Sequence, residues 1–115
     1  MRWLRKIPAR AKKAFTTNRI IKWWKAKRME KEIREILKFV IVVYKKDPET
    51  GESRIFQVNK DRLLEQSERL NDILTEYLKI KSLDDPDFMG GNQDRSNLVI
   101  IISMLTLLDP NFDLL

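Results

Sequence analysis

The chain has 115 residues and a formal net charge of +6, with 43% hydrophobic and 35% charged residues. This length limits it to one domain with at most a short extension, and the composition is that of a folded globular chain. The chain has no cysteine and no histidine. Their absence excludes disulfides, thiolate or imidazole metal sites, and catalysis by either side chain.

The charges divide along the chain. Residues 1–29 contain eleven lysines and arginines and no acidic residue. Because the whole chain carries +6, residues 30–115 carry −5, and residues 82–115 hold six aspartates against Arg95 alone. A basic head and an acidic tail are typical of a chain that contacts nucleic acid, an anionic membrane or a second protein copy.

Residues 1–18 are predicted to form a basic N-terminal arm. Apolar side chains recur at helical spacing on one face, at Leu4, Ile7, Ala11, Ala14 and Phe15. Pro8 would break a helix already under way, so residues 1–7 are expected to form a separate piece. Residues 16–18, Thr-Thr-Asn, offer side chains that cap the helix after them.

A long amphipathic helix is predicted over residues 19–38. Its apolar stripe is expected to face the core and consists of Ile20, Trp23, Met29, Ile33, Ile36 and Leu37. The first half is purely basic, whereas the second half mixes signs. Pairs such as Glu30 with Arg34, four residues apart, are typical of a solvated helix face.

A β-hairpin is predicted next, with strands over residues 39–44 and 54–58. Both runs are rich in β-branched and aromatic residues, and they flank a turn. Pro48 suits the second position of that turn, and Gly51 can take a positive φ. The alternative is that the preceding helix continues through Tyr44, because Leu37 and Val40 keep helical spacing with it. An all-α fold would then result.

Two further helices are predicted. Asn59 is expected to cap one that runs to about Ile80 with the apolar face Leu63, Leu70, Ile73, Leu74, Tyr77 and Leu78. Residues 82–94 are expected to form an acidic loop, because they contain Pro86 and a Gly-Gly pair. Residues 95–108 are expected to form a buried helix capped by Ser96 or Asn97, although a strand would fit the same apolar run.

The predicted fold class is therefore α+β and mainly helical, with residues 19–115 as one small domain. The apolar C-terminal tip, Phe112, Leu114 and Leu115, has two interpretations. It either docks on a partner or folds back on the core of its own chain.

No catalytic constellation is found, and the chain is interpreted as a non-enzymatic protein without a cofactor, a metal site or a small-molecule substrate. Asp84, Asp85 and Asp87 lie close together, but their spacing is not that of a calcium-binding loop. A solvated acidic loop is the preferred interpretation. The serines have no histidine to activate them.

The basic segment has three interpretations. Non-specific binding of nucleic acid would use cations on phosphates and aromatic rings on bases. Binding to an anionic membrane would use a basic amphipathic helix with tryptophan at the boundary. In the third interpretation Trp23 belongs to the core stripe and the lysines are its solvated side. The candidate anion-binding residues are Arg2, Arg5, Lys6, Arg10, Lys12, Lys13, Arg19, Lys22, Lys25 and Arg28.

The candidate residues for protein contacts are Trp3, Phe15, Trp24, Phe112, Leu114 and Leu115. Together these features favour a small structural or adaptor protein of a larger virion-like or nucleoprotein assembly. The arm would contact nucleic acid and the globular part other subunits, in a homo- or hetero-oligomer. The alternative function is that of a peripheral membrane-associated protein.

The expected location is the cytoplasm or the assembly itself. The N-terminus lacks the apolar core of a secretion signal. The longest apolar stretch, residues 98–108, has eleven residues, whereas about 20 are needed to span a bilayer.

Overall fold

The computed structural model describes residues 19–114 of the chain. The fold is mainly helical with one small antiparallel sheet, which confirms the predicted α+β class. In chain order the elements are α2 (Ile21–Val40), β1 (Ile41–Lys46), β2 (Ser53–Val58), α3 (Lys60–Glu65), α4 (Ser67–Leu78), the 3-10 turn η3 (Phe88–Gly90) and α5 (Asn92–Leu108).

Helix α2 is the longest element, with 20 residues. Its buried positions recur every three or four residues and end at Val40, so the helix keeps this side chain in the core. The predicted end at residue 38 was therefore two residues early. The first strand starts correspondingly later, at Ile41 instead of residue 39.

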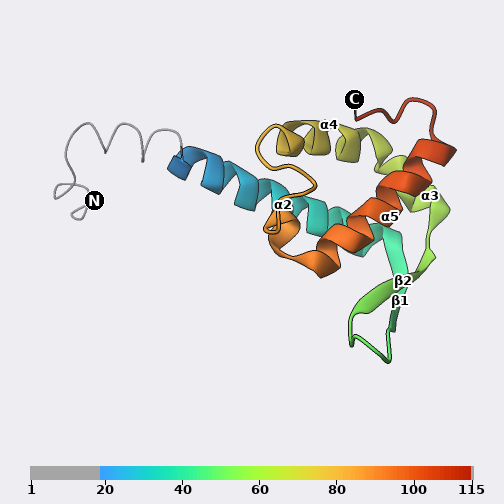
Figure 1. Cartoon of the computed structure of the whole chain (residues 1–115). Helices are drawn as coiled ribbons and strands as arrows, with labels where there is room; N and C mark the ends of the chain where they lie inside the picture. The colour runs from blue at the N-terminus through green and yellow to red at the C-terminus, as the bar shows by residue number, and fades with distance from the viewer. Residues whose placement is uncertain (1–18, 115) are drawn as a thin grey trace, which may run out of the picture.

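The predicted β-hairpin is confirmed. Strands β1 and β2 pair antiparallel in a two-stranded sheet, and the register shifts between Ile41 and Tyr44. Gly51 has the positive φ that the turn requires, at 74°, and its N–H donates to the carbonyl of Asp47 at 2.8 Å. The hairpin extends away from the helices at one end of the molecule (Figure 1).

The helix predicted over residues 59–80 is divided in two. Asn59 caps α3 as expected, since its side chain accepts a hydrogen bond from the Arg62 N–H at 3.1 Å. At Gln66 the backbone leaves the helical region, with φ −91° and ψ 0°. The break precedes Ser67, whose buried hydroxyl donates to Asp109 at 2.6 Å.

The segment predicted as a solvated acidic loop is partly core. Phe88 and Met89 of η3 are fully buried, while Asp84 and Asp87 are exposed. Helix α5 then begins at Asn92, earlier than predicted, with Gly91 before its first residue in place of the expected cap at Ser96 or Asn97.

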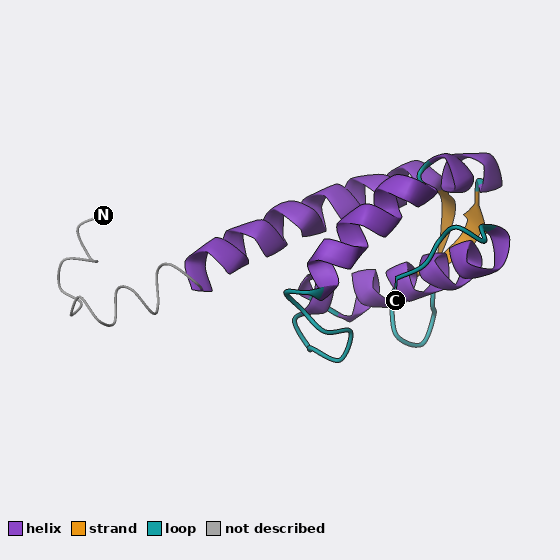
Figure 2. Ribbon diagram, turned by 90° about the horizontal axis from the view of Figure 1, so that it is seen from above, coloured by secondary structure: helices purple, strands orange, loops and turns teal. Residues whose placement is uncertain are grey.

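Helix α5 is also not buried throughout. Leu98, Ile101 and Leu105 are buried, whereas Val99 and Leu107 are exposed. In both views α2, α4 and α5 surround the shared core, and the first turns of α2 extend beyond the other elements (Figures 1 and 2).

Candidate functional site

The start of α2 projects from the helical body (Figure 1). Trp23 and Trp24 lie here with 51% and 60% of their surfaces exposed. Their rings meet edge to face with centroids 5.2 Å apart, and Lys27 Nζ lies 5.8 Å from the Trp23 ring centroid. These ring contacts all come from α2 itself.

The prediction that Trp23 is a core residue was wrong. Trp23 is three residues before the buried Ala26 and seven before the buried Glu30, so it follows the phase of the core-facing stripe. The stripe, however, continues past the point where other elements cover it. The helical period gives the direction of a side chain but not where the covering layer ends.

The projecting end is amphipathic around its own axis. Helical geometry places Ile20, Trp23 and Trp24 on one side, because they are three or four residues apart. Lys27 also lies on this side, because it is four residues after Trp23 and three after Trp24. The cations Arg19, Lys22, Lys25 and Arg28 follow one another every three residues along the other side. One side is therefore mainly apolar, with Lys27 beside the tryptophans, and the other is a cationic strip that includes Ile21 between Lys25 and Arg28.

A groove of about 440 Å³ lies between the cationic strip and the end of α4. Four cationic side chains and one carboxylate border it, and two apolar side chains complete the lining. The lining residues are Lys22, Lys25, Arg28, Met29, Glu76, Lys79 and Ile80. Within residues 19–114, Glu76 forms an ion pair with Lys79 at 3.0 Å, and no acidic group pairs with the three α2 cations.

A buried carboxyl group lies farther along α2. Glu30 has no exposed surface, and its Oε2 accepts a hydrogen bond from the Tyr77 hydroxyl at 2.7 Å. The sequence predicted a solvated Glu30 paired with Arg34. The pair exists at 3.7 Å, but Glu30 lies in the core because it shares the phase of Ile33 and Leu37.

The Glu30 site also holds the η3 turn in place. The Tyr77 oxygen accepts the Met89 N–H at 2.9 Å, and Arg34 donates to the Met89 carbonyl at 2.8 Å and to Asp94 at 3.0 Å. Met89 has φ 57°, an unfavourable conformation for a side chain other than glycine. Its buried side chain and both backbone bonds fix that conformation.

The charges around Glu30 come from three neighbours. Lys27 Nζ lies 3.6 Å and Arg34 Nη2 3.7 Å from Oε1, and Lys81 Nζ lies 3.9 Å from Oε2. Oε1 accepts no hydrogen bond from the described part of the chain. Burial raises the pKa of the Tyr77 hydroxyl, and its hydrogen bond to Glu30 raises this pKa further. Tyr77 therefore remains the donor to Glu30 at neutral pH.

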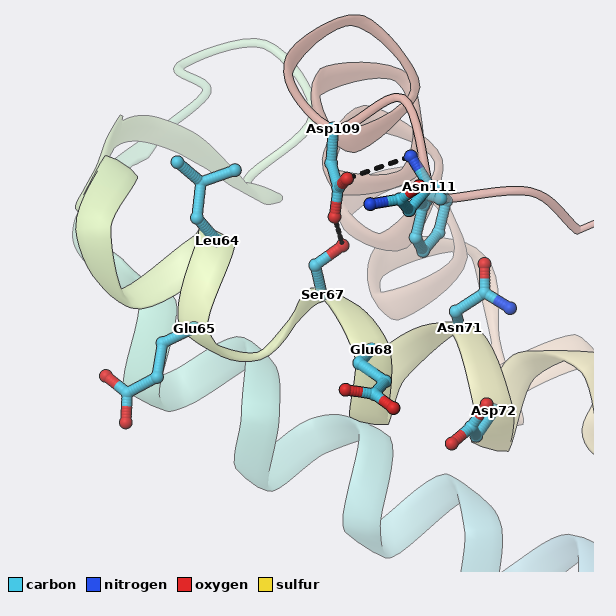
Figure 3. A pocket seen from close by; sticks show the side chains of 9 residues that line it. Leu64, Glu65, Ser67, Glu68, Asn71, Asp72, Asp109 and Asn111 are labelled. Carbon is cyan, nitrogen blue, oxygen red and sulfur yellow. Dashed lines mark hydrogen bonds between the residues drawn. The ribbon is translucent and has the colours of Figure 1, made fainter.

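A second hollow, of about 540 Å³, lies where the C-terminal segment meets α3 and α4 (Figure 3). Asp109 connects the C-terminal segment to α4, since its carboxylate accepts a hydrogen bond from the Ser67 hydroxyl at 2.6 Å. It also accepts one from the Asn111 N–H at 2.9 Å, within the C-terminal segment itself. The same two bonds hold the pKa of Asp109 below its usual range, the Ser67 bond first. Glu65, Glu68 and Asp72 also line this hollow.

Phe112 lies against this junction and is 6% exposed. Leu114 is partly buried against the same core. For these two residues the structure therefore shows the second of the two interpretations, in which the tip folds back on its own chain. The cause is the hydrogen-bonded turn at Asp109, which returns the chain to α4, where the Asn71 side chain accepts from the Asp113 N–H at 2.7 Å.

The outward face of α5 is uncharged. From Ser96 to Leu108 the helix contains no charged residue. The outward side chains at helical spacing are Ser96, Val99, Ile100, Ser103, Thr106 and Leu107, all of them exposed. Leu107 is 87% exposed.

Many sequence-predicted site residues lie outside the described residues. These are Arg2, Trp3, Arg5, Lys6, Arg10, Lys12, Lys13, Phe15 and Leu115. Of the rest, Lys22, Lys25 and Arg28 come together on α2, and Trp24 lies on the opposite side of the same helix. Arg19 lies just before the first residue of α2. Lys79 of the groove is not among the sequence-predicted candidates, because nothing in the sequence indicated that the end of α4 meets this part of α2.

Comparison with protein-family models, with curated proteins and with solved structures finds no match for this chain. Among residues 19–114, no helix has the length and apolar character needed to cross a membrane. The same residues contain no cluster of three or more acidic side chains arranged to hold a metal ion.

Proposed function

We propose that the protein is a small non-enzymatic adaptor that attaches to an anionic membrane surface through the projecting end of α2. The single observation that carries this proposal is the separation of side chains there. The exposed Trp23 and Trp24 occupy one side together with the half-buried Ile20, and the other side carries Lys22, Lys25 and Arg28, which form no ion pair with an acidic group of residues 19–114.

Lipid fits this arrangement better than nucleic acid does. A helix lying in the membrane interface inserts an apolar side and keeps cations at the level of the headgroups. Tryptophan prefers this boundary, because its ring is apolar and its N–H can remain hydrated. Each lysine or arginine near an anionic bilayer adds about 1 kcal/mol of attraction, and the projecting end has four on its cationic side.

Nucleic acid is the second candidate partner, and a specific observation favours it. Residues 19–29 contain no acidic side chain, and Lys27 extends the positive charge beyond the cationic strip. Such a surface can neutralise phosphates without reading sequence. In this case the exposed tryptophans would stack on unpaired bases.

Co-sedimentation with vesicles tests the membrane proposal. The wild-type chain should bind vesicles of mixed phosphatidylserine and phosphatidylcholine and remain free of pure phosphatidylcholine vesicles. Replacing Trp23 and Trp24 by alanine should weaken this binding by at least tenfold, because two interfacial rings are lost. The matched control replaces Leu64 and Leu83, two exposed leucines elsewhere, and should bind like wild type.

Two results would contradict the proposal. One is equal loss of binding in the tryptophan variant and its control. The other is binding to single-stranded oligonucleotides, weakened by salt, in the absence of any vesicle binding, which would establish the second candidate instead.

The same proposal assigns protein contacts to the helical body, and specifically the outward face of α5 to a second copy of this chain. An uncharged helix face can pack on itself across a twofold axis without charge repulsion, and antiparallel packing opposes the two helix dipoles. With Ser103 at the axis, Val99 of one copy meets Leu107 of the other, because each lies four residues from Ser103.

The mass in solution tests this contact. Wild type should form a species of twice 13.8 kDa, and Leu107→Glu should restore the monomer without loss of folding, because Leu107 is 87% exposed. The exposed Ile21 at the start of α2 provides the control, since Ile21→Glu lies away from α5 and should leave the dimer intact. A monomeric wild type at high protein concentration would exclude the α5 contact.

A further inference from the structure

We propose that the groove between α2 and the end of α4 binds the headgroup phosphate of an acidic phospholipid. The phosphate would sit between the α2 cations and Lys79, and the first part of an acyl chain would lie on Met29 and Ile80. This inference rests on the proposed function and specifies the site at which a single lipid, drawn out of the bilayer, is held, because the groove lies on the side of α2 opposite Trp24.

The groove has a positively charged lining. Lys22, Lys25 and Arg28 border the groove from α2, and Lys79 borders it from the opposite wall. The one carboxylate in the lining is Glu76, so the groove carries a net charge of about +3. Glu76 is paired with Lys79, but both side chains are more than half exposed. Such a pair is weak and yields readily to a phosphate ligand.

The apolar floor is the second argument. Met29 and Ile80 line the groove, and both pack partly against the hydrophobic core. A free phosphate or a nucleic-acid backbone gains nothing from these side chains. A phospholipid gains from both parts of the groove, because its phosphate and its acyl chain are covalently joined.

The position along α2 is the third argument. The next hollow along the same two helices has about 390 Å³ and shares Arg28, Met29 and Glu76. Three carboxylates line it, those of Glu32, Asp72 and Glu76, and Glu32 is paired with Arg69 at 2.9 Å. An anion is therefore attracted to the end of the groove beside the projecting turns of α2 and repelled from the other end.

A soluble short-chain lipid tests the groove without a membrane. Dioctanoyl-phosphatidylserine, below its micelle concentration, should shift the backbone amide signals of Met29, Lys79 and Ile80 in the full chain. Replacing Lys25 and Lys79 by glutamine removes one cation from each wall and should weaken this binding at least about tenfold. The control variant replaces the exposed Lys38 and Lys60, removes the same charge and should bind like wild type.

The possible results distinguish a failure of the lipid site from a failure of the membrane function. If wild type binds anionic vesicles but not the short-chain lipid, the proposed lipid site in the groove is wrong and the membrane function stands. The same holds if both double variants lose affinity for the short-chain lipid equally. If inorganic phosphate alone produces the same shifts at similar concentration, the site is one for free anions and the lipid assignment is overturned.

Nucleic acid supplies the last comparison. If the Lys25/Lys79 variant loses oligonucleotide binding while its lipid binding is unchanged, the groove belongs to a nucleic-acid surface and the proposal is wrong. If only the proposed membrane function is wrong, the wild-type chain binds the short-chain lipid in the groove but does not sediment with vesicles.

Discussion

Glu30 and Tyr77 show how single residues depart from their sequence pattern. A glutamate followed by an arginine four residues later is common on solvated helix faces, yet Glu30 is fully buried. Glu30 lies at helical spacing from Ile33 and Leu37, which places it on the buried side of α2, whereas its charge predicted a solvent-exposed position. The Tyr77 hydroxyl satisfies Glu30 and Met89 at once, and no sequence pattern reveals a contact between residues 47 positions apart.

Tyr77→Phe should destabilise the fold by about 2 kcal/mol or more. The ring still packs against Phe88, but Glu30 loses a donor and the Met89 N–H loses an acceptor, each at a cost of about 1–3 kcal/mol. Urea unfolding followed by circular dichroism measures the loss. The exposed Tyr44 is the control, and Tyr44→Phe should stay within about 0.5 kcal/mol of wild type. Equal stabilities of the two variants would contradict this account.

Asp109 should make stability depend on acid. The pKa of Asp109 is lowered in the folded state. Its contribution to the free energy of unfolding is therefore complete above its pKa in the unfolded chain, about 3.9, and disappears as the pH falls through its pKa in the folded state. Asp109→Asn should therefore be less stable than wild type at neutral pH. The two proteins should converge in stability once the pH has fallen below the lowered, folded-state pKa of Asp109. A difference that persists unchanged in acid would show that the carboxylate charge has no part in the contact.

At the scale of elements, the sequence predicted most of the structure but not the boundaries. Hydrophobic periodicity identified α2 and the helical segment that contains α3 and α4, and the β-branched composition of two runs identified the hairpin. The break at Gln66 and the burial of η3 depend instead on contacts with distant residues, Asp109 in one case and Arg34 in the other. Local patterns contain no signal for either contact.

Gly90→Ala should cost more stability than Gly51→Ala. Both glycines have positive φ, 76° and 74°, so each alanine incurs a penalty of about 1–2 kcal/mol. At Gly90 the new Cβ would also lie 2.9 Å from Arg34 Nη2, whereas at Gly51 the nearest atom is 4.0 Å away. Urea unfolding of the pair measures the difference. Equal losses would mean that Arg34 moves aside without disturbing the Met89 and Asp94 bonds.

At the scale of the whole molecule, the division of charge has a structural counterpart. The start of α2, which carries the basic residues, projects at one end (Figure 1), and the aspartates of residues 82–115 lie before η3, at the start of α5 and after its end. The sequence indicated an anionic partner but could not rank the candidates. That ranking depends on which side chains remain uncovered, and coverage is a property of the packed molecule. The exposure of Trp23 is the clearest case.

Tryptophan fluorescence tests the proposed attachment of α2 to membranes most directly. In the full chain with Trp3→Phe, emission comes from Trp23 and Trp24 alone, since the sequence has three tryptophans. Both rings are more than half exposed, so their emission should shift to the blue with phosphatidylserine-containing vesicles and stay unchanged with pure phosphatidylcholine vesicles. Unchanged emission with both kinds of vesicle would contradict the account.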